Sequence, residues 1–74
     1  MNFDEDFIER EYDRIDKLQD PEQQGYEAAP TILVDLGVSK DELLRILLGS
    51  AKVDDSDYAI SCTLGAIRWL IDNR

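Results

Sequence analysis

The stretch VSKDELLRILLG (residues 38–49) contains the clearest helix boundaries in this chain. Ser39 and Glu42 have the spacing of a capping box, in which the two side chains satisfy backbone N–H groups of the first helical turn. An apolar residue precedes Ser39 and can pack on Leu43 as a hydrophobic staple, and Gly49 is placed to end the helix. Because leucine and isoleucine fill most of the remaining positions, we expect this short helix to be buried on most of its sides.

Proline and glycine divide the chain before this helix. Asp20 and Pro21 match the preferences of an N-cap and a first helical position. Further on, a glycine and Pro30 both disfavour a long helix. The sequence therefore predicts a short helix or loop over residues 21–29 and a separate helical segment over residues 30–36, which the following glycine ends.

The beginning of the chain, residues 4–19, has the apolar spacing of an amphipathic helix. The apolar stripe consists of Phe7, Ile8, Tyr12, Ile15 and Leu18. Two start signals compete here, because Asn2 with Glu5 has a capping-box spacing and Asp4 can also serve as the N-cap.

Negative charge is concentrated in this first segment. The chain has 17 acidic and 8 basic residues, a net charge of −9, and residues 1–27 hold ten of the acids but only three bases. Six acids share the face opposite the apolar stripe: Glu5, Asp6, Glu9, Asp13, Asp16 and Asp20. Acids four residues apart on a helix repel one another by roughly 0.2–0.5 kcal/mol per pair. We interpret this face as a candidate partner-binding surface, and a merely solvated helix face is the alternative.

The last predicted helix, residues 56–73, follows a connection over residues 50–55 and has two apolar stripes. Its candidate caps are Asp54, Asp55 and Ser56. One stripe consists of Ile60, Leu64, Ile67 and Ile71, flanked by Ala59, Ala66 and Leu70. The other consists of Tyr58, Cys62, Gly65 and Trp69. We expect the first helix to cover this second stripe, with Gly65 allowing close approach. The alternative is a homodimer or partner interface formed by Tyr58, Cys62 and Trp69, because exposed aromatic residues are favoured interface anchors.

These segments predict an all-α fold, a small helical bundle of about four helical elements joined by short connections. At 74 residues the chain has room for one core, so we expect a single helical domain over residues 1–74. Hydrophobic residues make up 43% of the chain, which is enough for a folded domain.

The residue inventory argues against an enzyme. The chain has no histidine, which is the usual general base near neutral pH and the commonest metal ligand. Cys62 is the only cysteine, so an intramolecular disulfide and a cysteine-cluster zinc site are excluded, and we expect its thiol to be buried. The run Asp54-Asp55-Ser56-Asp57 lacks the glycine and the closing glutamate of a calcium-binding loop. We therefore expect no catalytic residue, no metal and no cofactor.

No apolar stretch is long enough to span a bilayer, and the acidic beginning of the chain is unlike a secretory or transit peptide. We therefore expect a cytoplasmic protein without a membrane partner.

Leu36-Gly37-Val38-Ser39 resembles the turn of a helix-turn-helix DNA reader. The helix that would read DNA carries Asp41 and several leucines beside its basic residues, and the whole chain has a net charge of −9. Since phosphate attraction is absent, we expect no direct binding to nucleic acid.

Part of the chain also resembles ubiquitin-associated (UBA) domains. Leu36-Gly37-Val38 is similar to their Met-Gly-Phe-type loop, and Ala66-Ile67-Arg68-Trp69-Leu70 is similar to the end of their last helix. The resemblance covers residues 30–71, with a longer connecting stretch and with Val38 in place of the loop aromatic. It implies a helical adaptor.

In size, acidity and lack of catalytic residues the whole chain resembles small anti-defence proteins of bacteriophages, including anti-CRISPR proteins, and it resembles bacterial immunity proteins for nuclease toxins. The first resemblance implies an inhibitor in the cytoplasm of a host cell. Its partner would be a protein with a basic, nucleic-acid-binding surface, and the chain itself would be a monomer or a weak homodimer. Glu5, Asp6, Glu9, Asp13, Asp16 and Asp20 would then occupy the groove that normally holds nucleic acid.

Overall fold

A computed structural model describes residues 5–74, and this part of the chain forms four α-helices and no strand, as the sequence predicts. The helices are α1 (Glu5–Asp16), α2 (Pro21–Leu36), α3 (Lys40–Val53) and α4 (Asp57–Asp72). The competing start signals at Asn2 and Asp4 lie outside the described residues.

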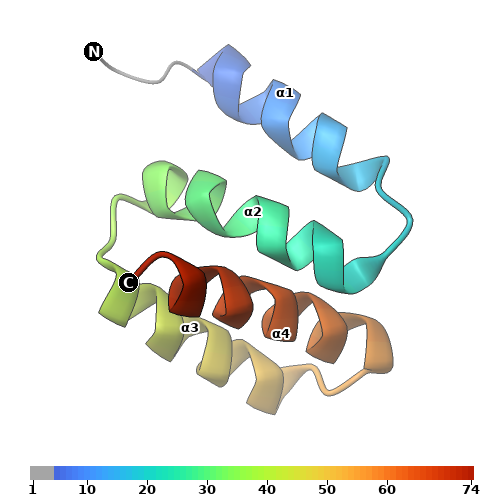
Figure 1. Cartoon of the computed structure of the whole chain (residues 1–74), viewed down its shortest axis with the longest axis vertical. Helices are drawn as coiled ribbons and strands as arrows, with labels where there is room; N and C mark the ends of the chain where they lie inside the picture. Colours follow the sequence, from blue (N-terminus) through green and yellow to red (C-terminus); the bar gives the residue numbers. More distant parts are fainter. Residues whose placement is uncertain (1–4) are drawn as a thin grey trace.

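In space the helices follow the order α1, α2, α4, α3 along the longest axis of the molecule (Figure 1). Helix α2 packs most extensively on α4, while α1 packs on α2 and α3 packs on α4. The buried centre consists of Ala29, Leu43, Ala66 and Leu70, with Ile32, Leu33, Val38, Leu47 and Trp69 packed against it. Ile15 is buried separately, on the inner side of α1.

Two glycines allow α2 and α4 to approach backbone to backbone. A Cβ added to Gly25 would overlap the carbonyl group of Cys62, and one added to Gly65 would overlap the carbonyl group of Glu22. The stripe that contains Gly65 therefore faces α2. The prediction that the first helix covers this stripe was wrong, because α1 rests on α2 instead.

Helix α2 is continuous from Pro21 to Leu36, so the predicted break at residue 30 was wrong. Pro30 lies inside the helix although proline lacks the N–H that the helical ladder needs. Packing explains the difference, since Gly25 meets α4 closely and Ala29 is completely buried. These tertiary contacts outweigh local preferences that would end an isolated helix.

Helix α3 runs four residues beyond Gly49, to Val53, so the connection to α4 is shorter than predicted. Gly49 has no positive φ, unlike Gly37, and therefore does not form the left-handed cap that ends a helix. The expected burial on most sides was also wrong: Leu43 is fully buried, but Leu44, Ile46 and Leu48 are exposed. The reason is that α3 contacts its neighbours along one side only, at the end of the row of helices (Figure 1).

The other predicted caps, at Asp20, Gly37, Ser39 and Ser56, are confirmed. Ser39 accepts a hydrogen bond from the backbone N–H of Glu42, and Gly37 has a φ of 65° at the end of α2. Among the three candidate caps of α4, Ser56 is the N-cap and accepts from the N–H of Ala59. Asp54 accepts from the N–H of Ser56, which lowers the pKa of that carboxyl.

Candidate functional site

Five acids form a row along α1, and we call Glu5, Asp6, Glu9, Asp13 and Asp16 the acid ridge. Asp16, at the end of the row, also borders a cleft between the helices. Every one of these side chains is exposed. Asp6, Glu9 and Asp13 surround a shallow hollow together with Arg10, whose Nε donates to the backbone carbonyl of Asp6. Within residues 5–74 no ion pair involves any acid of the ridge.

The sixth predicted acid, Asp20, does not belong to the ridge. Helix α1 ends at Asp16, and Asp20 is the N-cap of α2, where its carboxylate accepts from the N–H of Gln23 at 3.2 Å. Asp20 is exposed, but it borders a different hollow, which also contains Tyr26 and Arg68. The predicted row of six thus becomes a row of five and a separate cap.

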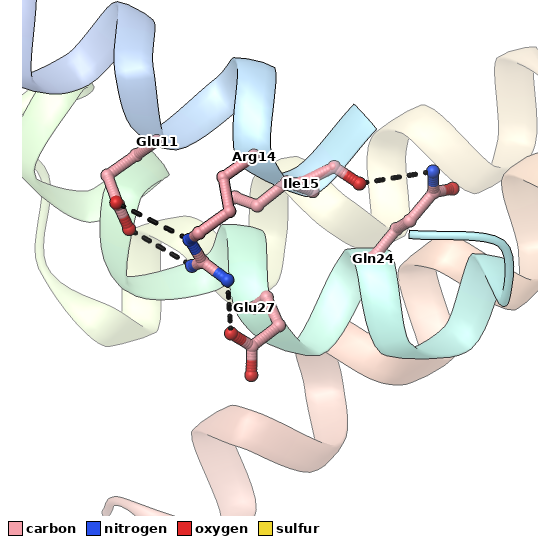
Figure 2. A network of polar contacts seen from close by, with 5 residues as sticks. All are labelled: Glu11, Arg14, Ile15, Gln24 and Glu27. Carbon is pink, nitrogen blue, oxygen red and sulfur yellow. Dashed lines mark hydrogen bonds and ion pairs between the residues drawn. The ribbon is translucent and has the colours of Figure 1, made fainter. Parts of the chain in front are cut away.

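Arg14 pairs with carboxylates outside the acid ridge. Its guanidinium group is 3.0 Å from a carboxylate oxygen of Glu11 on α1 and 3.0 Å from one of Glu27 on α2, as Figure 2 shows. Both carboxylates raise the pKa of Arg14. The pairing ties α1 to α2 on the side away from the acid ridge.

The side chain of Gln24 links the end of α1 to α2 through hydrogen bonds. Its side chain is 8% exposed, and Nε2 donates to the carbonyl oxygens of Leu18 at 2.7 Å and Ile15 at 3.3 Å (Figure 2 shows the second). These carbonyls lie in the last turn of α1 and just beyond it, where a helix leaves backbone acceptors unsatisfied. The amide oxygen of Gln24 accepts from the hydroxyl of Tyr58 at 2.6 Å. One buried amide thus connects α1, α2 and α4.

Two further tyrosines bond to carboxylates on other helices. Tyr12 on α1 donates to Asp35 on α2 at 3.0 Å, and Tyr26 on α2 donates to Asp72 on α4 at 2.8 Å. Partial burial and the neighbouring Asp35 raise the pKa of Tyr12 to about 12. Both tyrosines remain neutral donors at physiological pH, so they position α1 and α4 on α2.

The alternative interface at Tyr58, Cys62 and Trp69 is not one open surface. Tyr58 is 58% exposed, whereas Cys62 and Trp69 are partly buried. The Lys40 ammonium lies 5.7 Å from the centre of the Trp69 ring and also donates to the carbonyl of Asn73. Burial raises the pKa of the Cys62 thiol, which therefore stays protonated and unreactive near neutral pH.

An apolar cleft of about 220 Å³ lies between the helices beside Tyr58. All four helices contribute to its walls, among them Tyr12 and Asp16 of α1, Leu47 of α3 and Cys62 of α4. Two of its polar residues, Gln24 and Tyr58, bond to each other.

Among the described residues no group of three or more Cys, Asp or Glu side chains is arranged to hold a metal ion. None of the helices in this part of the chain has the length and apolar character needed to cross a membrane. Searches of protein-family models, curated proteins and solved structures gave no match to this chain.

Sequence periodicity identified the exposed acids but missed the residues that hold α1 in place. Gln24, Glu27 and Asp35 act on partners in another helix, and no local spacing signals such a contact. The lack of basic residues within one turn of Glu27 is the only local hint that it pairs at long range.

Proposed function

We propose that this protein is a small protein-binding inhibitor that places its acid ridge in a basic, nucleic-acid-binding groove of another protein. The observation that carries the proposal is the row of exposed acids on α1 without ion pairs, although Arg10 borders three of them and donates to a backbone carbonyl instead. Arg10 and Lys17 follow Asp6 and Asp13 by four residues, where helical ion pairs can form, yet within residues 5–74 neither pairs with an acid of the ridge.

The density of charge on the ridge is close to that of a nucleic-acid strand. Glu5 and Asp16 are the first and last residues of α1, and at 1.5 Å per residue they are separated by about 16 Å along the helix axis. One strand of B-DNA carries about five phosphates over this length, at 3.4 Å each. The ridge presents five carboxylates on the same length, so a groove that binds phosphates can bind it in a similar way.

The partner we propose is a nucleoprotein of bacterial defence, such as a CRISPR effector. The ridge would exclude DNA or RNA by occupying its groove, as anti-CRISPR proteins that imitate DNA do. A nuclease toxin is the alternative partner, because its basic active-site groove has the same chemistry. A UBA-like adaptor would instead bind through the turn after α2, where Leu36 is 52% exposed.

Competition with DNA tests the mechanism. A purified CRISPR effector is incubated with fluorescently labelled duplex DNA, and displacement by this protein is followed by fluorescence polarisation. We expect the wild-type chain to displace DNA and the variant Glu9→Lys/Asp13→Lys/Asp16→Lys to fail. The same assay with a nuclease toxin separates the two partner classes.

A matched control is the variant Asp41→Lys/Asp55→Lys/Asp57→Lys, which changes the net charge equally at exposed acids outside α1. We expect this control to displace DNA as well as the wild type. Equal loss in both variants would show that only net charge matters, and full activity of the ridge variant would overturn the proposal.

A further inference from the structure

The outer face of α3 and α4 carries an apolar surface that nothing in the described chain covers. We call it the α3–α4 face, and it consists of Leu44, Leu48, Leu64, Ile67 and Ile71. Four of these side chains are 37%, 49%, 51% and 53% exposed (Leu44, Leu48, Leu64 and Ile71). Leu44, Ile67 and Ile71 line one groove of about 360 Å³ between the two helices. From the sequence an exposed surface was considered only for the stripe with Trp69, whereas the structure exposes the other stripe of α4.

Charge makes this face different from the rest of the molecule. Residues 5–36 contain ten acids and three bases, whereas residues 37–74 contain six acids and five bases. Helix α1, with its acid ridge, lies at one end of the longest axis, and α3 and α4 lie at the other end (Figure 1). The apolar surface thus belongs to the nearly neutral half of a strongly acidic protein.

The rim of the α3–α4 face carries both signs of charge. Lys40 and Arg74 border the groove together with Asp41, and Arg45 is exposed on the next turn of α3. In a two-fold symmetric pair, each rim residue faces the surface of an identical chain. A rim with both signs can form pairs across such an axis, whereas the acid ridge would only repel its copy.

The size of the face sets the strength of the contact. At 1.5 Å per residue, α3 and α4 are about 21 Å and 24 Å long, and two adjacent helices are about 20 Å wide. The face therefore covers roughly 450 Å² in projection, or about 900 Å² for two copies before side-chain relief is added. Stable interfaces usually bury at least about 1,200 Å², so an association through this face is weak.

We propose that two copies of this protein associate through their α3–α4 faces as a weak, two-fold symmetric dimer. The arrangement buries the exposed leucines and isoleucines against each other and leaves both acid ridges free at the far ends. The molecule is 35 Å long, which is about four Debye lengths at physiological ionic strength, so repulsion between the ridges is largely screened.

Sedimentation equilibrium of the purified chain tests the dimer. Over a range of roughly 10 µM to 1 mM, where weak dimers dissociate and form, we expect the average mass to rise from 8.5 kDa towards twice that value. The variant Leu64→Lys/Ile71→Lys should raise the dissociation constant at least tenfold. The single variant Ile71→Lys, at the end of α4, is a milder form of the same test.

Leu36→Lys/Val53→Lys is the matched control, because both residues are exposed (52% and 90%), both lie off the face, and the net charge changes equally. We expect this control to dimerise as the wild type does and both variants to keep their helical circular dichroism. Dilution of the wild type should shift the NMR signals of the methyl groups of Leu44, Leu64 and Ile71.

Three results would overturn the dimer: a mass of 8.5 kDa at every concentration, equal weakening in the variant and its control, or dilution shifts confined to Tyr58 and Trp69. A monomer that binds a different apolar protein through this face gives the first of these results. The dimer does not depend on the proposed inhibition, because the triple lysine variant of α1 should dimerise normally.

Discussion

At the scale of single residues, two glycines within helices differ in what surrounds them. Gly25 faces the backbone of α4, and a Cβ there would overlap the carbonyl of Cys62. Gly49 faces open space in the middle of α3. The first glycine makes the α2–α4 contact possible, while the second only weakens its helix.

Alanine substitution should therefore change stability in opposite directions at the two sites. Gly25→Ala forces α2 and α4 apart and should cost about 3 kcal/mol or more, a large part of the total of a small domain. Gly49→Ala should add about 0.5–1 kcal/mol because alanine is the better helix former. Urea unfolding followed by circular dichroism measures both. A Gly25→Ala variant as stable as the wild type would contradict the close packing of these helices.

Because of Tyr12, the stability of the fold should depend on pH in the alkaline range. Partial burial and Asp35 raise its pKa to about 12, above the ordinary value near 10, so the folded state favours the neutral phenol. This stabilisation is complete below about pH 10 and is lost as the pH rises through about 12. We expect the urea midpoint to fall between about pH 10 and pH 12, and to fall less in Tyr12→Phe.

The stability that Tyr12→Phe still loses at alkaline pH comes from the other two tyrosines. Asp72, which accepts the Tyr26 hydroxyl, raises the pKa of Tyr26, and partial burial together with Cys62 raises that of Tyr58. Tyr26→Phe is the comparison for the effect of one phenol. Identical pH profiles for wild type and Tyr12→Phe would mean that the bond to Asp35 does not persist in solution.

At the scale of the helices, the sequence was sufficient to find the ends that are capped. It was not sufficient to show that a helix continues through a proline or a glycine. Ser39, Ser56 and Gly37 act on backbone groups within a few residues, so their spacing predicts their roles. The continuity of α2 through Pro30 depends instead on its contacts with α1 and α4. Local preferences of about 1–3 kcal/mol are overridden where a helix is held on two sides.

The candidate site shows the same division between local and long-range information. Helical periodicity correctly placed the five acids of the ridge on the solvent side of α1, because that pattern depends on one helix alone. It could not show which helix covers which stripe of α4. That arrangement depends on close backbone contacts between α2 and α4, of Gly25 with Cys62 and of Gly65 with Glu22. The exposed α3–α4 face follows from this choice and was therefore not predicted.

The attachment of α1 should depend on the buried amide of Gln24. Gln24→Leu keeps a similar volume but leaves carbonyls at the end of α1 and the Tyr58 hydroxyl without their partner, at a cost of about 1–3 kcal/mol. Hydrogen exchange should show reduced protection of the amides of α1 in particular.

Its matched control is Gln23→Leu, because the Gln23 side chain is exposed and only its backbone N–H is bonded, to Asp20. We expect this control to keep the exchange pattern of the wild type. Equal loss of protection throughout all four helices in Gln24→Leu would mean that α1 unfolds only together with the rest of the domain.

At the scale of the whole molecule, the two proposed surfaces differ in chemistry and lie at opposite ends. The acid ridge is on α1, at one end of the molecule, and the helices that carry the apolar α3–α4 face lie at the other end (Figure 1). A dimer through the apolar face would present two acid ridges pointing away from each other. Such a dimer could bind two basic grooves at once, which raises the effective concentration of the second ridge.

Salt should act on the two surfaces in opposite directions. Raising the ionic strength from about 0.1 M to 1 M shortens the Debye length from about 10 Å to 3 Å. Binding of a basic partner through Glu9, Asp13 and Asp16 should weaken at least tenfold, because screening removes most of its attraction. Dimerisation through Leu64 and Ile71 should keep its dissociation constant or tighten, since the same salt screens the repulsion between two chains of charge −9. Isothermal titration calorimetry with the purified CRISPR effector and sedimentation equilibrium of the chain alone measure the two effects under identical conditions. If the affinity for the partner did not change with salt concentration, the acid ridge would be ruled out as the binding surface. If the dimer dissociated at high salt, its charged rim and not its apolar face would hold it together.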